Sequence, residues 1–128
     1  MLAALMLATV SVLAPAKVAA GQVASVSVTI TPAAGETISR DGPVIVDVRV
    51  DKDSGVSLAQ RRYWREDAAD PQAGAPRFDV RVRGERPGTW PVTVRVRLWV
   101  CAGDICTPVD ENRRVDVTVT AAPAPSSQ

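Results

Sequence analysis

Histidine is absent from all 128 residues, and aromatic residues make up only 4% of the chain. Without histidine there is no Ser-His-Asp or Cys-His nucleophilic machinery and no histidine-containing zinc site. Cysteine is almost as scarce, because Cys101 and Cys106 are the only two, and two cysteines alone make a poor zinc site. We therefore expect no metal and no cofactor, and the chemistry left to this chain is that of its cysteine pair.

An excess of charge of either sign is also missing. The chain carries 15 basic and 14 acidic residues, and loss of an amino-terminal leader would remove Lys17 and leave 14 of each. A neutral chain lacks the basic field that general nucleic-acid binders and anionic-membrane binders use. We expect no nucleic-acid partner.

The amino-terminal residues differ from the remainder of the chain. Leu2 to Leu13 is almost entirely apolar but too short to span a bilayer, and no basic residue precedes it. Val18-Ala19-Ala20 offers small residues for cleavage before Gly21, with Ala14-Pro15-Ala16 as a second option. We interpret residues 1–20 as a signal peptide. This predicts an exported protein, periplasmic or extracellular, without a membrane span after the leader is removed.

Alternation of apolar and polar residues predicts several strands between residues 21 and 120. It covers 22–30, 44–51, 78–83, 91–100 and 115–120, with Gly, Pro and Asp clusters between these segments. Residues 56–64 are ambiguous, because a strand would weaken after Leu58 and a short helical turn fits Ala59–Tyr63. No segment has a convincing helical pattern, so we expect one all-β domain, an antiparallel β-sandwich. Residues 121–128 carry no core pattern, so we expect them to form a disordered tail.

Valines define the expected core. The expected buried residues share one face of each strand: Val46, Val48, Val80, Val94, Val96, Leu98, Val117 and Val119. The opposite faces carry Asp and Arg of mixed sign, including Arg95 and Arg97, which we expect to be exposed. Such residues more often form solvated cross-strand pairs than an arginine-lined ligand surface.

The segment from Pro91 to Thr120 reads as a long strand, a cysteine-bounded turn and a return strand. If the four residues between Cys101 and Cys106 form a hairpin loop, the two cysteines lie directly opposite each other on one face. Their Cα atoms would then be within disulfide range. The same register would place Glu111 and Arg113 on the apolar side, and Pro108 cannot donate to a ladder. We therefore expect a bulge or a departure from the sheet after Cys106.

Two interpretations of the cysteine pair stay open at this point. A clip would hold the hairpin closed, although a loop of about six residues stabilises by only about 2 kcal/mol in the chain-entropy model. An exchangeable dithiol would suit a pair that lies off the valine face, on the side of Trp99. Neighbouring charges do not decide between them, because Asp104 would raise a nearby thiol pKa and Arg113 would lower it.

The stretch LWVCAGDICTPVDENRRVDVTV resembles the cysteine hairpin of the amino-terminal periplasmic domain of the thiol:disulfide interchange protein family DsbD. The resemblance covers about thirty residues and rests on an aromatic strand, C-x4-C, x-Pro and a return strand. Val109 stands where that family usually has a second proline, and Leu98 where it usually has the aromatic. The resemblance implies an immunoglobulin-like sandwich in which Cys101 and Cys106 are the redox pair, with Trp99 and Pro108 as supporting residues.

The function that follows from this resemblance is thiol–disulfide exchange. Its implied partner is an envelope protein with an exchangeable disulfide or dithiol. The alternative is a non-enzymatic immunoglobulin-like binding module in which the same two cysteines form a structural hairpin disulfide.

Overall fold

The structure, a computed structural model, describes residues 9–15 and 17–122. The described residues contain no α-helix and one turn of 3-10 helix, η1 (Arg65–Asp67). The strands are β1 (Thr9–Leu13), β2 (Val18–Ala19), β3 (Val23–Thr31), β4 (Thr37–Ile38), β5 (Ile45–Val50), β6 (Val56–Leu58), β7 (Arg62–Trp64), β8 (Arg77–Gly84), β9 (Gly88–Ala102) and β10 (Ile105–Thr120).

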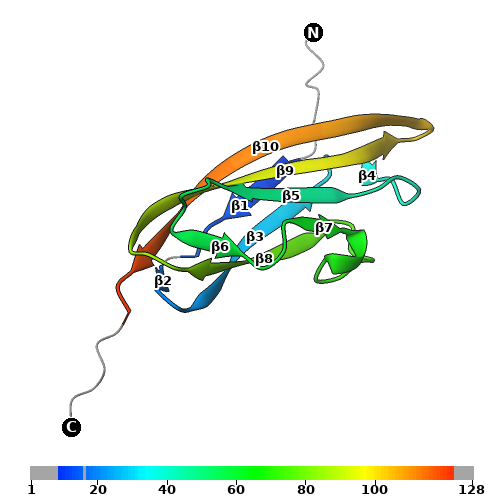
Figure 1. Cartoon of the computed structure of the whole chain (residues 1–128). Helices are drawn as coiled ribbons and strands as arrows, with labels where there is room; N and C mark the ends of the chain where they lie inside the picture. Colours follow the sequence, from blue (N-terminus) through cyan, green and yellow to red (C-terminus); the bar gives the residue numbers. More distant parts are fainter. Residues whose placement is uncertain (1–8, 16, 123–128) are drawn as a thin grey trace.

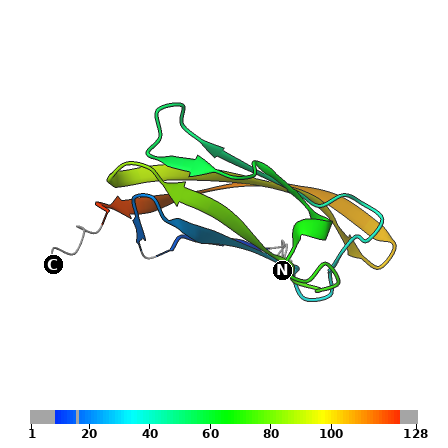
Figure 2. The same cartoon turned by 60° about the horizontal axis from the view of Figure 1, so that its bottom comes forward.

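Two sheets form the layers of the molecule (Figures 1 and 2). The first has the order β1-β3-β8-β6, and the second has the order β2-β10-β9-β5-β7, with β4 also pairing with β9. All pairs are antiparallel except β2 with β10. The expected antiparallel β-sandwich is confirmed.

The valine rows fill the space between the sheets. All eight expected core residues are buried, and Phe78, Val26, Val28 and Val92 join them with no exposed surface. This confirms the strand phase, since one face of each strand is apolar and its neighbouring residues are polar. Arg95 and Arg97 are half-buried and not fully exposed, because each lies along an ion pair on the outer face of the second sheet.

Residues 56–64 divide between the two sheets. β6 ends at Leu58 and pairs with β8 in the first sheet, whereas β7 begins at Arg62 and pairs with β5 in the second. The strand therefore weakens where expected, but the helical turn suggested for Ala59–Tyr63 does not form. The helical turn comes later, at Arg65–Asp67.

The β9–β10 hairpin is longer and more regular than the sequence suggested. Its pairing runs without interruption from Ala102 with Ile105 to Gly88 with Val119, so the expected bulge after Cys106 is wrong. Glu111 and Arg113 do lie on the core side, but at the margin of the sandwich, where they are half-buried. There Arg113 Nη1 pairs with Glu111 Oε2 at 3.1 Å, and Arg113 Nε donates to the backbone oxygen of Val10.

The expected leader, 1–20, lies partly outside the described residues. Within the described part, Thr9–Leu13 form β1 at the margin of the first sheet and Val18–Ala19 form β2 beside β10. Val10 and Val18 are buried. Cleavage before Gly21 stays a prediction. The expected disordered tail also lies mostly outside the described residues, which end at 122.

Candidate functional site: the hairpin disulfide and its pocket

Cys101 and Cys106 form a disulfide near the tip of the β9–β10 hairpin, with an S–S distance of 2.06 Å and a Cα–Cα distance of 4.0 Å. The tip is tighter than the expected four-residue loop, because Ala102 still pairs with Ile105. Only Gly103 and Asp104 remain in the turn, and Gly103 has φ +61°. A two-residue turn with glycine first and positive φ only there fits a type II′ hairpin.

The ladder geometry explains why the two sulfurs meet. In an antiparallel pair, directly opposite residues alternate between hydrogen-bonded sites and closer, non-hydrogen-bonded sites. The backbone oxygen of Trp99 accepts from the N–H of Ser39, on the side of β9 away from β10. The backbone oxygen of Thr120 accepts from the N–H of Ala20, on the side of β10 away from β9. By alternation, the backbone groups of Cys101 and Cys106 point away from each other, so the cysteines occupy a close, non-hydrogen-bonded site.

The two cysteines are not equally accessible. Cys101 is half-buried, because β4 covers its strand on the outer side through the pairing of Thr37 with Cys101. Cys106 is exposed, as are its neighbours Ile105 and Thr107. We therefore expect a reagent from solution to approach the disulfide from the Cys106 side.

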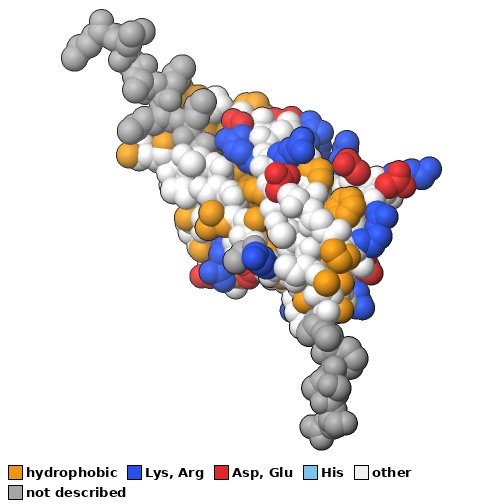
Figure 3. Space-filling view, turned by 90° about the vertical axis from the view of Figure 1, so that its left-hand side faces the viewer, with side chains coloured by type: hydrophobic (Ala, Val, Ile, Leu, Met, Phe, Trp, Pro, Cys, Tyr) orange, Lys and Arg blue, Asp and Glu red, His pale blue; other side chains and the backbone are white. Residues whose placement is uncertain are grey.

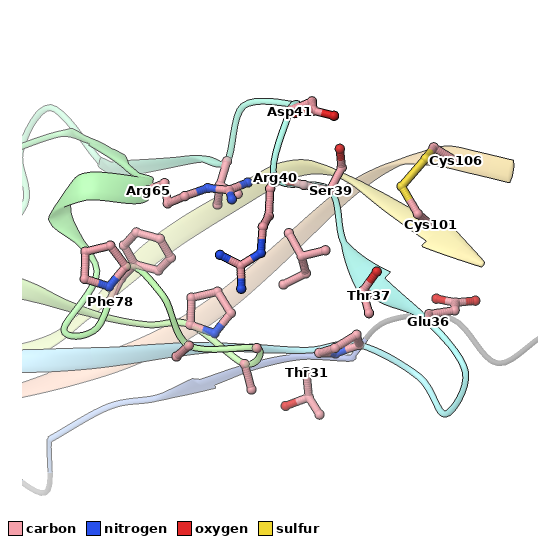
Figure 4. A pocket seen from close by; sticks show the side chains of 18 residues that line it. Thr31, Glu36, Thr37, Ser39, Arg40, Asp41, Arg65, Phe78, Cys101 and Cys106 are labelled. Atoms are coloured by element: carbon pink, nitrogen blue, oxygen red, sulfur yellow. Dashed lines mark hydrogen bonds between the residues drawn. A yellow bond between two sulfur atoms is a disulfide. The ribbon is translucent and has the colours of Figure 1, made fainter. Parts of the chain in front are cut away.

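The disulfide borders a pocket of about 610 Å³ at this end of the sandwich (Figure 4). The wall is mainly apolar and includes Ile38, Val44, Phe78 and several prolines. In Figure 4 the disulfide lies at one end and Phe78 at the other. The lining residues come from four separate segments of the chain, so no local sequence pattern indicated this pocket.

Two arginines lie in the pocket wall, and both are already partly engaged. Arg65 Nη2 donates to the backbone oxygens of Ser39 and, at 3.1 Å, Gly42. Arg40 Nη1 donates to Gln72 Oε1 at 2.9 Å. Glu36 is half-buried, and its Oε2 atom has no hydrogen-bond partner among the described residues. The pocket thus combines apolar walls with charges of both signs.

The supporting residues predicted from the sequence lie beside the disulfide on the same strands. Trp99 pairs with Pro108 two positions further down the ladder, on the face that carries the cysteines. Trp99 is 41% exposed, and its side chain packs against the Ser39–Gly42 turn, where a Cβ on Gly42 would lie 3.0 Å from Trp99 Cδ1. Neither residue lines the pocket.

The outer face of the second sheet carries charged residues that pair across its strands. Asp47 binds Arg62 Nε at 2.7 Å and Arg97 Nη2 at 2.6 Å, and Asp110 accepts two hydrogen bonds from Arg95. Burial acts to raise the pKa of Asp47, but the hydrogen bonds and charges of both arginines outweigh it and lower that pKa. The hydrogen bond from Arg95 lowers the pKa of Asp110. This matches the expected solvated cross-strand pairs.

The face drawn in Figure 3 also shows Lys and Arg side chains lying among Asp and Glu. Within residues 9–15 and 17–122, no three His, Cys, Asp or Glu side chains gather closely enough to hold a metal ion. In the same part of the chain, no helix is long and apolar enough to cross a membrane.

Comparison with known proteins adds little. No protein-family model and no curated protein matches this chain. Among solved structures, the crystal structure of domains 4 and 5 of the S-layer protein SbsC is similar, with 21% sequence identity and a TM-score of 0.47. The match covers 90% of this chain and 51% of that one, so the chain spans about half the length of its structural neighbour.

Proposed function

We propose that this chain is an exported thiol–disulfide exchange domain in which Cys101 and Cys106 alternate between a disulfide and a dithiol. One observation carries the proposal: the disulfide lies at the hairpin tip, outside the valine core, and Cys106 is an exposed residue. Exchange requires a thiolate to reach one sulfur in line with the S–S bond, which a disulfide buried in the core would prevent. The resemblance to the DsbD amino-terminal domain supports the same role.

The exchange would proceed in two balanced steps. A thiolate of the partner attacks the Cys106 sulfur, forming a mixed disulfide and releasing Cys101 as a thiolate. A second partner thiolate then attacks the partner's own sulfur in that mixed disulfide and releases Cys106. The partner leaves with a disulfide, and this domain has gained two electrons. Its two thiolates take up the two protons that the partner thiols lost on ionising, which gives a dithiol. The reverse sequence reduces a partner disulfide.

The energetics favour exchange over a clip. The two cysteines are five positions apart and already face each other within an uninterrupted ladder. Closing so short a loop adds only about 2 kcal/mol in the chain-entropy model. Reduction should therefore leave the sandwich folded, as a reversible carrier needs.

The pocket beside the disulfide supports a partner that presents a largely apolar segment. Ile38, Pro32 and Pro71 offer accessible apolar surface within the same concavity that Cys101 and Cys106 border. A segment seated there would bring its own sulfur toward Cys106. We place the exchange in the periplasm or outside the cell, where disulfides form and persist.

Equilibration of the full chain in graded thiol buffers tests this function. Free cysteines are alkylated and counted at each potential while circular dichroism follows the fold. We expect a potential well above about −300 mV, the value below which structural disulfides usually lie. We also expect little unfolding on reduction. A pair that stays oxidised below that value, or whose reduction melts the sandwich, would overturn the proposal.

Matched single-cysteine variants test the order of attack. In Cys101→Ser the exposed Cys106 thiol remains, and in Cys106→Ser only the half-buried Cys101 thiol remains. We expect Cys101→Ser to react faster with a small aromatic disulfide probe at a given thiolate fraction. Equal rates would remove the argument that Cys106 is the attacked sulfur.

The second candidate is a binding module with a structural disulfide. It is favoured by the pairing of Thr37 with Cys101, through which the clipped hairpin holds β4 in the pocket wall. If that role is the correct one, reduction should alter the pocket without any exchange reaction. The thiol-buffer titration separates the two functions.

A further inference from the structure

The outer margin of β10 is open over most of its length. On one side β10 pairs with β9 from Ile105 to Val119. On the other side, among residues 9–15 and 17–122, it pairs with β2 only at Val119 and Thr120. Figure 1 shows β10 along the border of the second sheet. An unpaired strand of this length is a template for another strand.

The direction of the backbone groups on this margin follows from one hydrogen bond. Ala20 N donates to Thr120 O at 2.9 Å, so the carbonyl of Thr120 points outward, away from β9. Successive residues of a strand point their N–H and C=O groups to alternate sides. Since the ladder with β9 has no bulge, the even-numbered residues of β10 all point outward. Asp110 and Arg114 therefore offer backbone donors and acceptors on this margin, and Pro108 offers only its carbonyl. Asn112 offers its N–H, whereas its carbonyl oxygen accepts from Arg113 Nη1 at 2.9 Å and keeps one further lone pair.

The sequence along this margin is complementary to its own reverse. Around Asn112 it reads Val109-Asp110-Glu111-Asn112-Arg113-Arg114-Val115. Reversing the segment exchanges each acid with a base and each valine with a valine. A strand of this kind suits a second copy of itself that runs in the opposite direction.

We propose that two copies of this chain associate through β10, antiparallel, about a twofold axis at Asn112. In this register Asp110 faces Arg114 of the second copy, Glu111 faces its Arg113, and Val109 faces its Val115. Each ion pair occurs twice because of the symmetry. The two six-stranded sheets become one continuous sheet, in the β-augmentation mode of recognition. The interface does not depend on thiol exchange.

The charges select this register over its neighbours. A twofold axis perpendicular to the sheet keeps opposite residues on the same face. The register of one strand against the other can therefore change only in steps of two residues. One shift places Glu111 opposite Glu111, and the other places Arg113 opposite Arg113. Like charges directly opposite each other are destabilising, whereas the Asn112 register pairs all four charges.

Three of the four charged side chains, those of Asp110, Glu111 and Arg113, already have partners within the chain. Arg114 has a side chain 70% exposed, and its nearest acid is Asp116 at 3.9 Å. Asp110 already accepts from Arg95, but an ionised carboxylate has about four acceptor sites. Glu111 and Arg113 pair with each other within one chain, and the same two groups would pair across the axis. β1 of the other sheet also contacts Arg113, whose Nε donates to the carbonyl oxygen of Val10.

Mixing two charge variants tests the proposal on the full chain. Glu111→Arg places arginine opposite Arg113, and Arg113→Glu places glutamate opposite Glu111, each twice per dimer. By sedimentation equilibrium we expect wild type to dimerise and each variant to be weakened by about tenfold, roughly 1.4 kcal/mol. An equimolar mixture should recover the dimer, because the arginine introduced at position 111 of one chain then faces the glutamate introduced at position 113 of the other. The control is Arg81→Glu, which changes an exposed charge on β8 and should dimerise as wild type does.

Circular dichroism confirms that each variant is folded, and recovery on mixing cannot arise from contacts within one chain. A chain that stays monomeric up to its solubility limit would overturn the proposal and leave the margin to a strand of a different protein. The proposal would also be overturned if Glu111→Arg did not weaken dimerisation, or if mixing the two variants did not restore it.

Site-specific crosslinking tests the register independently. Asn112→Cys should form a disulfide with its own copy, because directly opposite Cα atoms lie about 5.5 Å apart. Arg114→Cys is the matched control, since the two copies of position 114 would be about 13 Å apart. Peptide mapping of the oxidised dimer should identify the link between the two Asn112→Cys sites. Equal linking at position 114 would contradict the register.

Discussion

Arg113 donates a hydrogen bond from Nε to the carbonyl oxygen of Val10 at 3.3 Å, across 103 positions of the sequence. The contact joins β10 of one sheet to β1 of the other, at the border where the two sheets meet. A charged group can lie on the core side here because its guanidinium finds a carbonyl and a carboxylate while its stem covers apolar surface.

We predict that Arg113→Ala lowers the free energy of unfolding by about 1 kcal/mol, the usual contribution of a hydrogen-bonded group of this kind. Arg114→Ala, the exposed neighbour, should change it by about 0.5 kcal/mol or less. Urea unfolding at a dilution that keeps the chain monomeric measures both. Equal effects would mean that Arg113 does not join the two sheets.

Leu98→Ala should destabilise the protein by about 2–5 kcal/mol, because Leu98 is 3% exposed and its loss leaves a cavity between the sheets. Arg95→Ala, on the opposite face of the same strand, should destabilise the protein far less, because its ion pair with Asp110 is screened by solvent. Thermal unfolding of both variants checks this, and similar midpoints would contradict the strand phase.

Asp47 makes the free energy of unfolding depend on pH. Its pKa in the folded protein lies below the ordinary value of 3.8, so its stabilising effect is present above that value and is lost as the pH falls through the folded pKa. Asp47→Asn should cost about 1–3 kcal/mol near neutral pH, since it removes the charge that Arg62 and Arg97 share. The difference from wild type should narrow below about pH 4.

Urea unfolding across a pH series measures this narrowing. Asp51→Asn is the control, because Asp51 forms no ion pair within the described residues. It should change the free energy by about 0.5 kcal/mol or less near neutral pH. A constant difference between Asp47→Asn and wild type down to low pH would show that the Asp47 carboxylate is not stabilised by its arginines.

Removal of residues 1–20 would take β1 and β2 from the sandwich. We predict export with cleavage before Gly21, since the apolar run is short and small residues precede that site. The cleaved chain should be less stable than the intact chain, because two buried side chains, Val10 and Val18, each contribute about 1.5–3 kcal/mol. Mass spectrometry of exported protein identifies its first residue, and an intact Met1 would contradict cleavage.

The strands with clean alternation could be predicted from the sequence. Features that depend on where a strand lies in its sheet could not. Val92 to Val100 alternate without exception, so their burial could be predicted from spacing alone. Glu111 and Arg113 suggested a bulge because spacing does not reveal that β10 borders the sheet, where half-burial is tolerated. The opposed cysteines were predictable from a local turn, whereas the pocket beside them needs segments far apart in the chain.

The uninterrupted β9–β10 ladder also has a consequence for the order of folding. Its two strands are adjacent in sequence, so their contacts close small loops, whereas contacts such as those of β1 with β10 close large ones. Hairpins form within about 1–10 μs, faster than sandwiches assemble. Cys101 and Cys106 are brought face to face by this hairpin alone. Their oxidation therefore requires no other strand, and the sulfur bond can form on a chain whose sheets have not yet met.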